Sequence, residues 1–280
     1  MKTFIITDST SEISQNTAKE NDIYVIPMSV TFNGKTYLDG VDMFHEEFYK
    51  TLEESETLPT TTQVTPHRYK EIFSKILEDP EAEIFGLFLS STLSGSYNSA
   101  RIAAEELETD RIYLTDSLTV TGGLGLLVFI ANDLRKRGLG AAGIKEKIEE
   151  LIPRLEIMMC LTTLKYLKAG GRISSASAAV GNLLKIVPVA RIDNGEIVSI
   201  GKLRGKSSAM DFIFSKIDLS PADSEYPVAF MNAVNEDMCE KMISRYKSAY
   251  PIENALVFPM GPVVGTYSGP GCFGIAYIKK

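Results

Sequence analysis

The sequence contains few of the residues from which metal sites and nucleophilic centres are usually built. It has no tryptophan, two histidines (His45 and His67) and three cysteines (Cys160, Cys239 and Cys272) among 280 residues. The cysteines are odd in number and widely spaced, so they match neither a zinc ligand set nor a CxxC redox pair. Neither histidine has a second His or Cys partner at metal-ligand spacing. We therefore expect no metal site, and cysteines that are reduced and structural.

Excess positive charge and long hydrophobic runs are also missing. The net charge is -7, with 29 Lys and Arg against 36 Asp and Glu, which disfavours nucleic acid as the main partner. The opening "MKTFIITDST" has an apolar run too short for a signal peptide, and the longest later run, "LGLLVFIA", is far shorter than a membrane span. These absences predict a soluble, cytoplasmic protein.

The remaining composition suits two domains of ordinary size, because 44% of the residues are apolar. Apolar runs of strand length alternate with helical patterns in the first half. The expected strands are 2–7, 83–89 and 111–116, and the expected helices are 67–79, 96–107 and 125–138. This alternation predicts an α/β domain with a mostly parallel sheet at 1–155. A second α/β domain is expected at 156–280, with a β-hairpin at "DNGE".

Hydroxyl-rich segments follow the predicted strands of the first half. They are "TDST" at 7–10, "SSTLSGS" at 90–96 and "TDSLTVTGG" at 115–123, and "LPTTTQVTP" at 58–66 precedes a predicted helix. Such residues often only cap helices and tighten turns. However, the carboxyl ends of parallel strands gather at one edge of a sheet, where ligands bind. Hydroxyls and helix N-termini can hold a carboxylate without Lys or Arg, whereas a phosphate normally recruits those cations.

Three segments resemble catalytic or nucleotide-binding motifs, but none of them matches its motif. "GPGCFG" at 269–274 has the letters of a dinucleotide fingerprint but precedes a predicted strand where that fold needs a helix. "GKLRGKS" at 201–207 is one residue too short between its glycines for a phosphate-binding loop. "GTYSG" at 265–269 has its serine one place late for a nucleophile elbow.

Six segments in order along the chain resemble the signatures of the DegV family. They are "TDSTSE", "PTTTQVTP", "SSTLSGSYNSA", "LKYLKAGGRIS", "KLRGK" and "GPVVGTYSGPGCFG". The resemblance implies two α/β domains with a long-chain fatty acid in the cleft between them. Members of the fatty-acid-kinase B type present the carboxylate of this lipid to a separate ATP-dependent kinase, which forms an acyl phosphate for phospholipid synthesis. The implied protein has no catalysis and no cofactor of its own, and at most transient membrane contact.

The resemblance also implies roles for single residues. Thr61 and Thr62 occupy the family's hydroxyl pair, and Ser94 and Gly95 occupy the turn that contacts the carboxylate. Tyr267 stands where members of the kinase-partner type usually carry histidine. A phenol can donate a hydrogen bond to a carboxylate, but unlike imidazole it does not titrate near neutral pH. Lipid binding should therefore tolerate this departure better than the kinase-partner role.

Two arginines fall at family positions associated with the kinase and its phosphate. These are Arg172 in "GGRIS" and Arg204 in "KLRGK". Each could instead be an ordinary solvated surface charge. Two further alternatives stay open: an enzyme that acts on a small carboxylated or phosphorylated metabolite with Asp8 or Asp116 as the base, and a lipid carrier or sensor that has no kinase partner.

Overall fold

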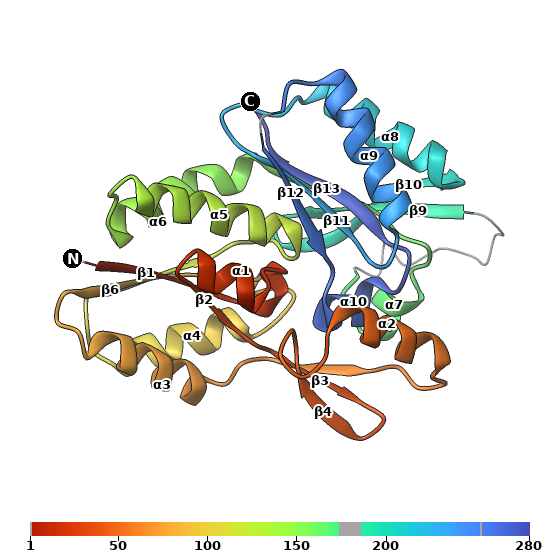
Figure 1. Ribbon diagram of the computed structural model, residues 1–280. Coiled ribbons are helices and arrows are strands. Elements are labelled where there is room, and N and C mark those ends of the chain that lie inside the picture. Colours follow the sequence, from red (N-terminus) through yellow and green to blue (C-terminus); the bar gives the residue numbers. More distant parts are fainter. Residues whose placement is uncertain (1, 174–185, 253) are drawn as a thin grey trace.

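The computed structural model describes residues 2–173, 186–252 and 254–280. Two large β-sheets and a small three-stranded sheet are combined with helices into a mixed α/β fold (Figure 1). The predicted fold class is thereby confirmed. The β-rich segment that contains the predicted hairpin starts at Leu183, outside the described residues, and continues inside them from Ile186.

The first large sheet is fully parallel, in the order β2-β1-β6-β7. Its strands are β1 (Lys2–Asp8), β2 (Ile23–Ile26), β6 (Ala82–Phe88) and β7 (Ile112–Asp116). Every residue of β6 is buried, because helices cover both faces of the sheet and a continuous apolar run is then favoured. The helices of this half are α1 (Gln15–Glu20), α3 (Pro66–Leu77), α4 (Ser96–Glu105), α5 (Gly122–Lys136) and α6 (Ala141–Leu151). The carboxyl ends of β1, β6 and β7 carry the hydroxyl-rich turns.

Helix α5 lies between the two large sheets. It packs against β1 and β6 on one side and against strands of the second large sheet on the other, as Figure 1 shows. The part of the helix with the sequence "GGLGLLVFIA" has no face exposed to solvent, so apolar residues are favoured on all of its sides. This position explains why the segment is apolar all round. One hydrophobic core consequently runs from the first sheet to the second, including for example Leu87 and Met231.

The second large sheet has the order β10-β9-β8-β13-β11-β12 and is antiparallel except for the β11–β12 pair. Its strands are β8 (Leu155–Cys160), β9 (Ile186–Asp193), β10 (Glu196–Arg204), β11 (Val228–Asn232), β12 (Ala255–Pro259) and β13 (Phe273–Ile278). The predicted hairpin joins β9 to β10 through Asn194 and Gly195. Helices α8 (Lys206–Leu219) and α9 (Glu236–Ala249) cover its outer face. This sheet begins at Leu155, whereas the domain boundary at 155/156 stays a prediction.

Sequence reasoning missed the small sheet, which has the order β4-β3-β5. It consists of β3 (Ser29–Phe32), β4 (Lys35–Leu38) and β5 (Thr60–Thr62). Strand β5 is only three residues long and reads as a loop in the sequence, because no alternation can be recognised over three threonines. Helix α10 (Pro262–Ser268) contacts β3 and β5 of this sheet, and helices α2 (His45–Glu54) and α7 (Lys165–Ala169) pack against α10 (Figure 1).

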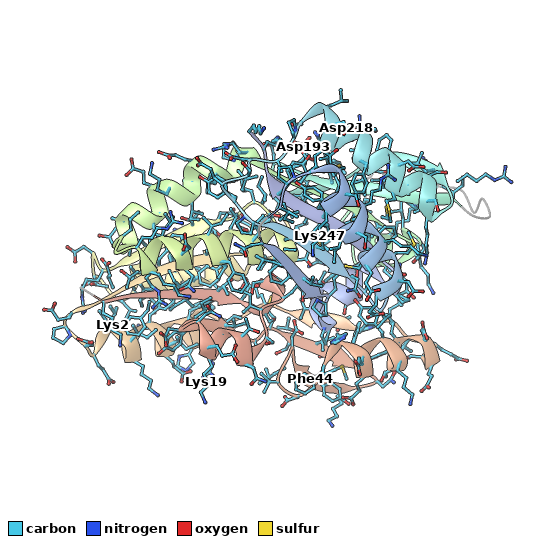
Figure 2. All side chains as sticks on the ribbon, turned by 45° about the horizontal axis from the view of Figure 1, so that its top comes forward. Lys2, Lys19, Phe44, Asp193, Asp218 and Lys247 are labelled. Atoms are coloured by element: carbon cyan, nitrogen blue, oxygen red, sulfur yellow. The ribbon has the colours of Figure 1, made fainter. Side chains whose placement is uncertain are left out.

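The surface and the interior differ as the composition predicts. Charged side chains such as Lys19 and Asp218 project outward in Figure 2. Phe44 is an exception among the aromatic residues, because 57% of its surface is accessible. All three cysteines are buried and unpaired. Within the described ranges, no helix has the length and apolarity required to cross a bilayer.

Candidate functional site

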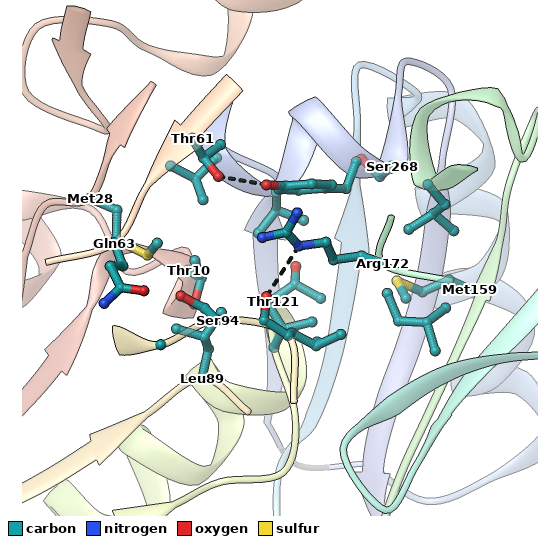
Figure 3. A pocket seen from close by; sticks show the side chains of 18 of the residues that line it. Thr10, Met28, Thr61, Gln63, Leu89, Ser94, Thr121, Met159, Arg172 and Ser268 are labelled. Atoms are coloured by element: carbon teal, nitrogen blue, oxygen red, sulfur yellow. Dashed lines mark hydrogen bonds between the residues drawn. The ribbon is translucent and has the colours of Figure 1, made fainter. Parts of the chain in front are cut away.

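A cavity lies where the two large sheets and the small sheet meet, and it encloses about 840 Å³ of empty space, open solvent at its mouth included (Figure 3). Its wall is mostly apolar, as the walls of small-molecule sites usually are. The lining comprises Thr10, Met28, Thr61, Gln63, Leu89, Leu93, Ser94, Gly95, Val120, Thr121, Met159, Leu161, Leu167, Arg172, Ile197, Val263, Val264, Tyr267 and Ser268. Four of the five predicted lipid-binding residues therefore face one cavity.

Strand β5 separates its two predicted site residues. Thr61 pairs with Val30 of β3, and its hydroxyl lies 2.6 Å from the Tyr267 hydroxyl of α10 (Figure 3). Thr62 is exposed and does not line the cavity, because neighbouring side chains of a strand point to opposite faces. The structure thus brings Thr61 and Tyr267 together across 206 residues of sequence and leaves Thr62 outside.

The turn at 90–96 divides its hydroxyls between two tasks. Ser90 and Thr92 both donate to the carbonyl oxygen of Gly195 at the tip of the β9–β10 hairpin, at 2.9 and 2.5 Å. Ser94 faces the cavity, and its oxygen accepts the backbone N–H of Ser96 at 3.3 Å. In the described part of the chain no acceptor takes the Ser94 hydroxyl hydrogen, so it is available for a ligand.

Gly95 is required by close packing. A Cβ at this position would lie 2.2 Å from Oε1 of Gln63, so any side chain would displace this amide. Gln63 is itself fixed by donating to Ser99 Oγ at 2.9 Å. The glycine that precedes α4 therefore lets the cavity wall close against the end of β5.

Arg172 lies at the cavity and is the one charged residue among the described residues of its lining. Its guanidinium donates to the carbonyl oxygens of Leu93, at 3.3 Å, and Gly170, and its central carbon lies 5.0 Å from the centre of the Tyr267 ring. A Cβ on Gly170 would lie 2.4 Å from that ring, so this glycine is needed for the close approach. Sequence reasoning gave Arg172 to a partner surface, whereas the structure places its side chain beside the predicted carboxylate position.

Arg204 lies elsewhere, at the last position of β10 and opposite Ile186. Its side chain is exposed and does not line the cavity. The two arginines that sequence reasoning grouped together are thus in different environments.

Carboxylic acids stand behind the cavity wall. The Thr10 hydroxyl donates to Asp8 at 2.5 Å, and the Thr121 hydroxyl donates to Glu12 at 3.1 Å. Burial raises the pKa of Asp8. Burial and the nearby Asp39 raise the pKa of Glu12 well above its ordinary value. Burial also raises the pKa of Asp39, to about 7. Because the pKa of Asp39 is about 7, its protonated form near neutral pH reduces the repulsion that an anion in the cavity would meet.

Neither proposed general base is placed for chemistry in the cavity. Asp8 accepts the backbone N–H groups of Thr10 and Leu89, at 3.0 and 3.1 Å. Asp116 accepts those of Ser91 and Leu118, each at 3.1 Å. Both carboxylates hold turns together, and neither lines the cavity, so the geometry gives the enzyme alternative no support.

Sequence reasoning found only part of the remaining cavity wall. Thr121 lies in the predicted hydroxyl-rich segment 115–123 but was not singled out; it precedes α5 with φ 52°, a conformation that is unusual for a β-branched residue. Met159 and Ile197 come from the second sheet and were read only as strand residues. Gln63 follows the threonines in "PTTTQVTP", but no feature of the neighbouring sequence indicated its contact with Gly95. Only the Thr-Gly-Gly sequence before an apolar helix offered a signal.

Comparison with known proteins gives a consistent result. The model of an uncharacterised protein family, DegV, matches residues 2–280. A DegV domain-containing protein of Clostridium acetobutylicum is 35% identical over 99% of this chain and 98% of its own. A solved DegV family protein from Thermus thermophilus, described by its fatty acid binding, is 28% identical, with TM-score 0.91 over 99% of this chain and all of the other. The fatty acid kinase B3 protein of Streptococcus pneumoniae, solved with linoleic acid, shares the fold at 22% identity, with TM-score 0.86 over both whole chains.

Proposed function

Because the chain belongs to the DegV family, we propose that its cavity binds a long-chain fatty acid. The carboxylate is held by the hydroxyls of Thr61, Ser94 and Tyr267 together with Arg172, and the acyl chain lies against the apolar wall. The observation that carries this proposal is the composition of the lining: six hydroxyl-bearing residues, Thr61, Ser94 and Tyr267 among them, and one cation among the described residues line an otherwise mostly apolar cavity.

Physical magnitudes are compatible with tight binding. Burial of each methylene is worth about 0.8 kcal/mol, so a chain of about sixteen carbons offers roughly 10 kcal/mol before the costs of association. Hydrogen bonds to a charged group add about 1.5 to 3 kcal/mol each. The acyl chain thus supplies affinity, and the polar cluster fixes which end of the lipid faces Arg172.

Two measurements test the lipid site. Mass spectrometry of the denatured protein purified from bacteria should find a fatty acid at near-stoichiometric occupancy. The delipidated protein should bind palmitic acid at least tenfold more tightly than methyl palmitate, because the ester has the same chain without the charge. A protein that carries no acyl lipid and takes up no added fatty acid would contradict the proposal.

We further propose that the bound carboxylate is presented to a separate kinase, which forms an acyl phosphate. The support is the resemblance of "GGRIS" and "KLRGK" to the kinase-partner type of the family and the exposure of Arg204. In this arrangement Arg172 contacts the lipid carboxylate and Arg204 contacts the kinase, so the two arginines separate lipid binding from partner binding.

A comparison of variants tests this division. Arg204→Ala should keep palmitate affinity and lower acyl-phosphate formation by an added DegV-partner kinase with ATP, whereas Arg172→Ala should lower both. Lys247→Ala, at an exposed cation on α9 labelled in Figure 2, is the matched control and should change neither. If the wild-type protein binds palmitate but yields no acyl phosphate with any such kinase, it is a lipid carrier or sensor.

A further inference from the structure

Helix α10 supplies four residues of the cavity lining: Val263, Val264, Tyr267 and Ser268. The residue that precedes it, Gly261, has no side chain with which to cap the helix. Its backbone N–H is instead accepted by Oε2 of Glu12 at 2.7 Å. Glu12, near the start of the chain, therefore holds the first turn of a helix that lies near the end of the chain.

A second acid acts at the same place. Asp39 lies near the backbone N–H of Val263, is 3% exposed and accepts the Ser9 hydroxyl at 2.8 Å. A Cβ built on Gly261 would lie 2.9 Å from an oxygen of Asp39 and 3.1 Å from Oε2 of Glu12. The two carboxyl groups thus converge on the start of α10 and leave no room there for a side chain.

Glu12 also reaches the opposite wall of the cavity. Its other oxygen, Oε1, accepts the hydroxyl of Thr121, which is fully buried. One carboxyl group therefore joins the start of α5 to the start of α10, and both positions border the space assigned to the lipid.

We propose that Glu12 and Asp39 are positioning residues of the fatty-acid site: they fix α10 so that the Tyr267 hydroxyl stays beside Thr61. This inference rests on the proposed function for its link to lipid affinity, but the placement of Tyr267 can be measured without lipid. Neither acid lines the cavity, so both act on the ligand only through α10 and Thr121.

Titration of the pair supplies a signature that simple packing would not produce. The titratable groups that face the pair are Asp8 and, from α2, Tyr49. Burial raises the pKa of Asp39 to about 7. Ionisation of Asp39 therefore occurs near neutral pH and places a negative charge at the start of α10.

The matched control is Glu83, a buried acid that holds a helix in the same manner away from the cavity. It accepts the backbone N–H of Ala141 at the start of α6, at 2.7 Å, and the hydroxyl of Thr3, at 2.5 Å. Glu12→Ala and Glu83→Ala each remove one helix-start acceptor and one threonine acceptor. Glu12→Gln keeps one carbonyl oxygen for Gly261 and is the conservative rescue.

The experiment records the ¹³C-tyrosine NMR signal of Tyr267 in lipid-free protein, assigned with Tyr267→Phe, and the affinity for palmitic acid. Glu12→Ala should shift the signal and weaken palmitate binding roughly tenfold, Glu12→Gln should stay within about threefold of wild type, and Glu83→Ala should change neither. The wild-type signal should also move between about pH 6 and 8, and Asp39→Asn should abolish that step.

A Glu12→Ala variant that resembles Glu83→Ala in both readouts would overturn the inference. If Glu12→Ala does not fold, Asp39→Asn decides the question. A pH-dependent shift of the Tyr267 signal that persists in Asp39→Asn would also contradict the inference. Wild-type protein that binds no palmitate would refute the proposed function alone, since the Tyr267 signal still reports whether the two acids position α10.

Discussion

The turns that follow β1 and β6 contain similar residues but use them differently. In the turn at 8–12, Thr10 donates to Asp8 and Ser9 donates to Asp39, so these hydroxyls serve buried acids. In the turn at 90–96 there is no acid, and the hydroxyls serve the β9–β10 hairpin and, at Ser94, the cavity. A hydroxyl-rich turn is therefore free to bind a ligand only where no neighbouring carboxylate has already taken its hydrogens.

The difference also concerns stability. Ser9, Thr10 and Ser11 of the first turn are all buried, and a buried polar group without a partner costs free energy. The second joins two halves of the chain at the surface of the cavity. Substitutions should consequently affect folding in the first turn and lipid affinity in the second.

The largest effect is expected at Asp8. Asp8→Ala leaves the N–H groups of Thr10 and Leu89 and the Thr10 hydroxyl without their acceptor. A buried group without a partner costs about 1 to 3 kcal/mol, so the free energy of unfolding should fall by roughly 3 to 5 kcal/mol. Urea unfolding measures this change. Asp8→Asn retains one acceptor oxygen and should lose less; equal stability of Asp8→Ala and wild type would show that the turn is not held in this way.

An intermediate effect is expected at Ser94. Ser94→Ala removes a hydrogen bond to the lipid carboxylate, worth about 1.5 to 3 kcal/mol, and should weaken palmitate binding roughly tenfold to a hundredfold. The melting temperature should change little. Ser90→Ala, in the same turn, should instead cost about 1 kcal/mol of stability through the lost bond to Gly195 and leave affinity unchanged. Interchanged phenotypes would reverse the division of tasks within this turn.

The smallest effect is expected at Tyr267. In the proposed site its hydroxyl contacts both Thr61 and the lipid, so Tyr267→Phe should lower palmitate affinity by only about three- to tenfold, since Thr61 retains its own hydroxyl. Tyr267→His should add a pH dependence near neutrality, because imidazole titrates there and a phenol does not. Isothermal titration between pH 6 and 8 compares the three proteins; identical pH profiles would exclude a direct role of this side chain at the carboxylate.

Local patterns in the sequence were sufficient for much of the fold. The continuous apolar run of β6, the helical spacing after Ser96 and the hairpin at Asn194 and Gly195 each depend on neighbours within a few residues. Such features are predictable because strand alternation, helix periodicity and turn conformation are short-range properties. The hydroxyl-rich turns were likewise visible, and their gathering at one sheet edge followed from the parallel order of the strands.

Tertiary structure alone decided which of these residues face the cavity. Thr61 and Thr62 are adjacent and chemically identical, yet pairing of β5 with β3 turns only Thr61 toward Tyr267. Glu12 accepts a hydrogen bond from Gly261, 249 residues away in the sequence, and no pattern within either segment predicts that contact. The sequence by itself determined the elements and the supply of hydroxyls, whereas strand register and long-range packing determined which of them a lipid can reach, because hydrogen-bond partners are chosen by proximity in space.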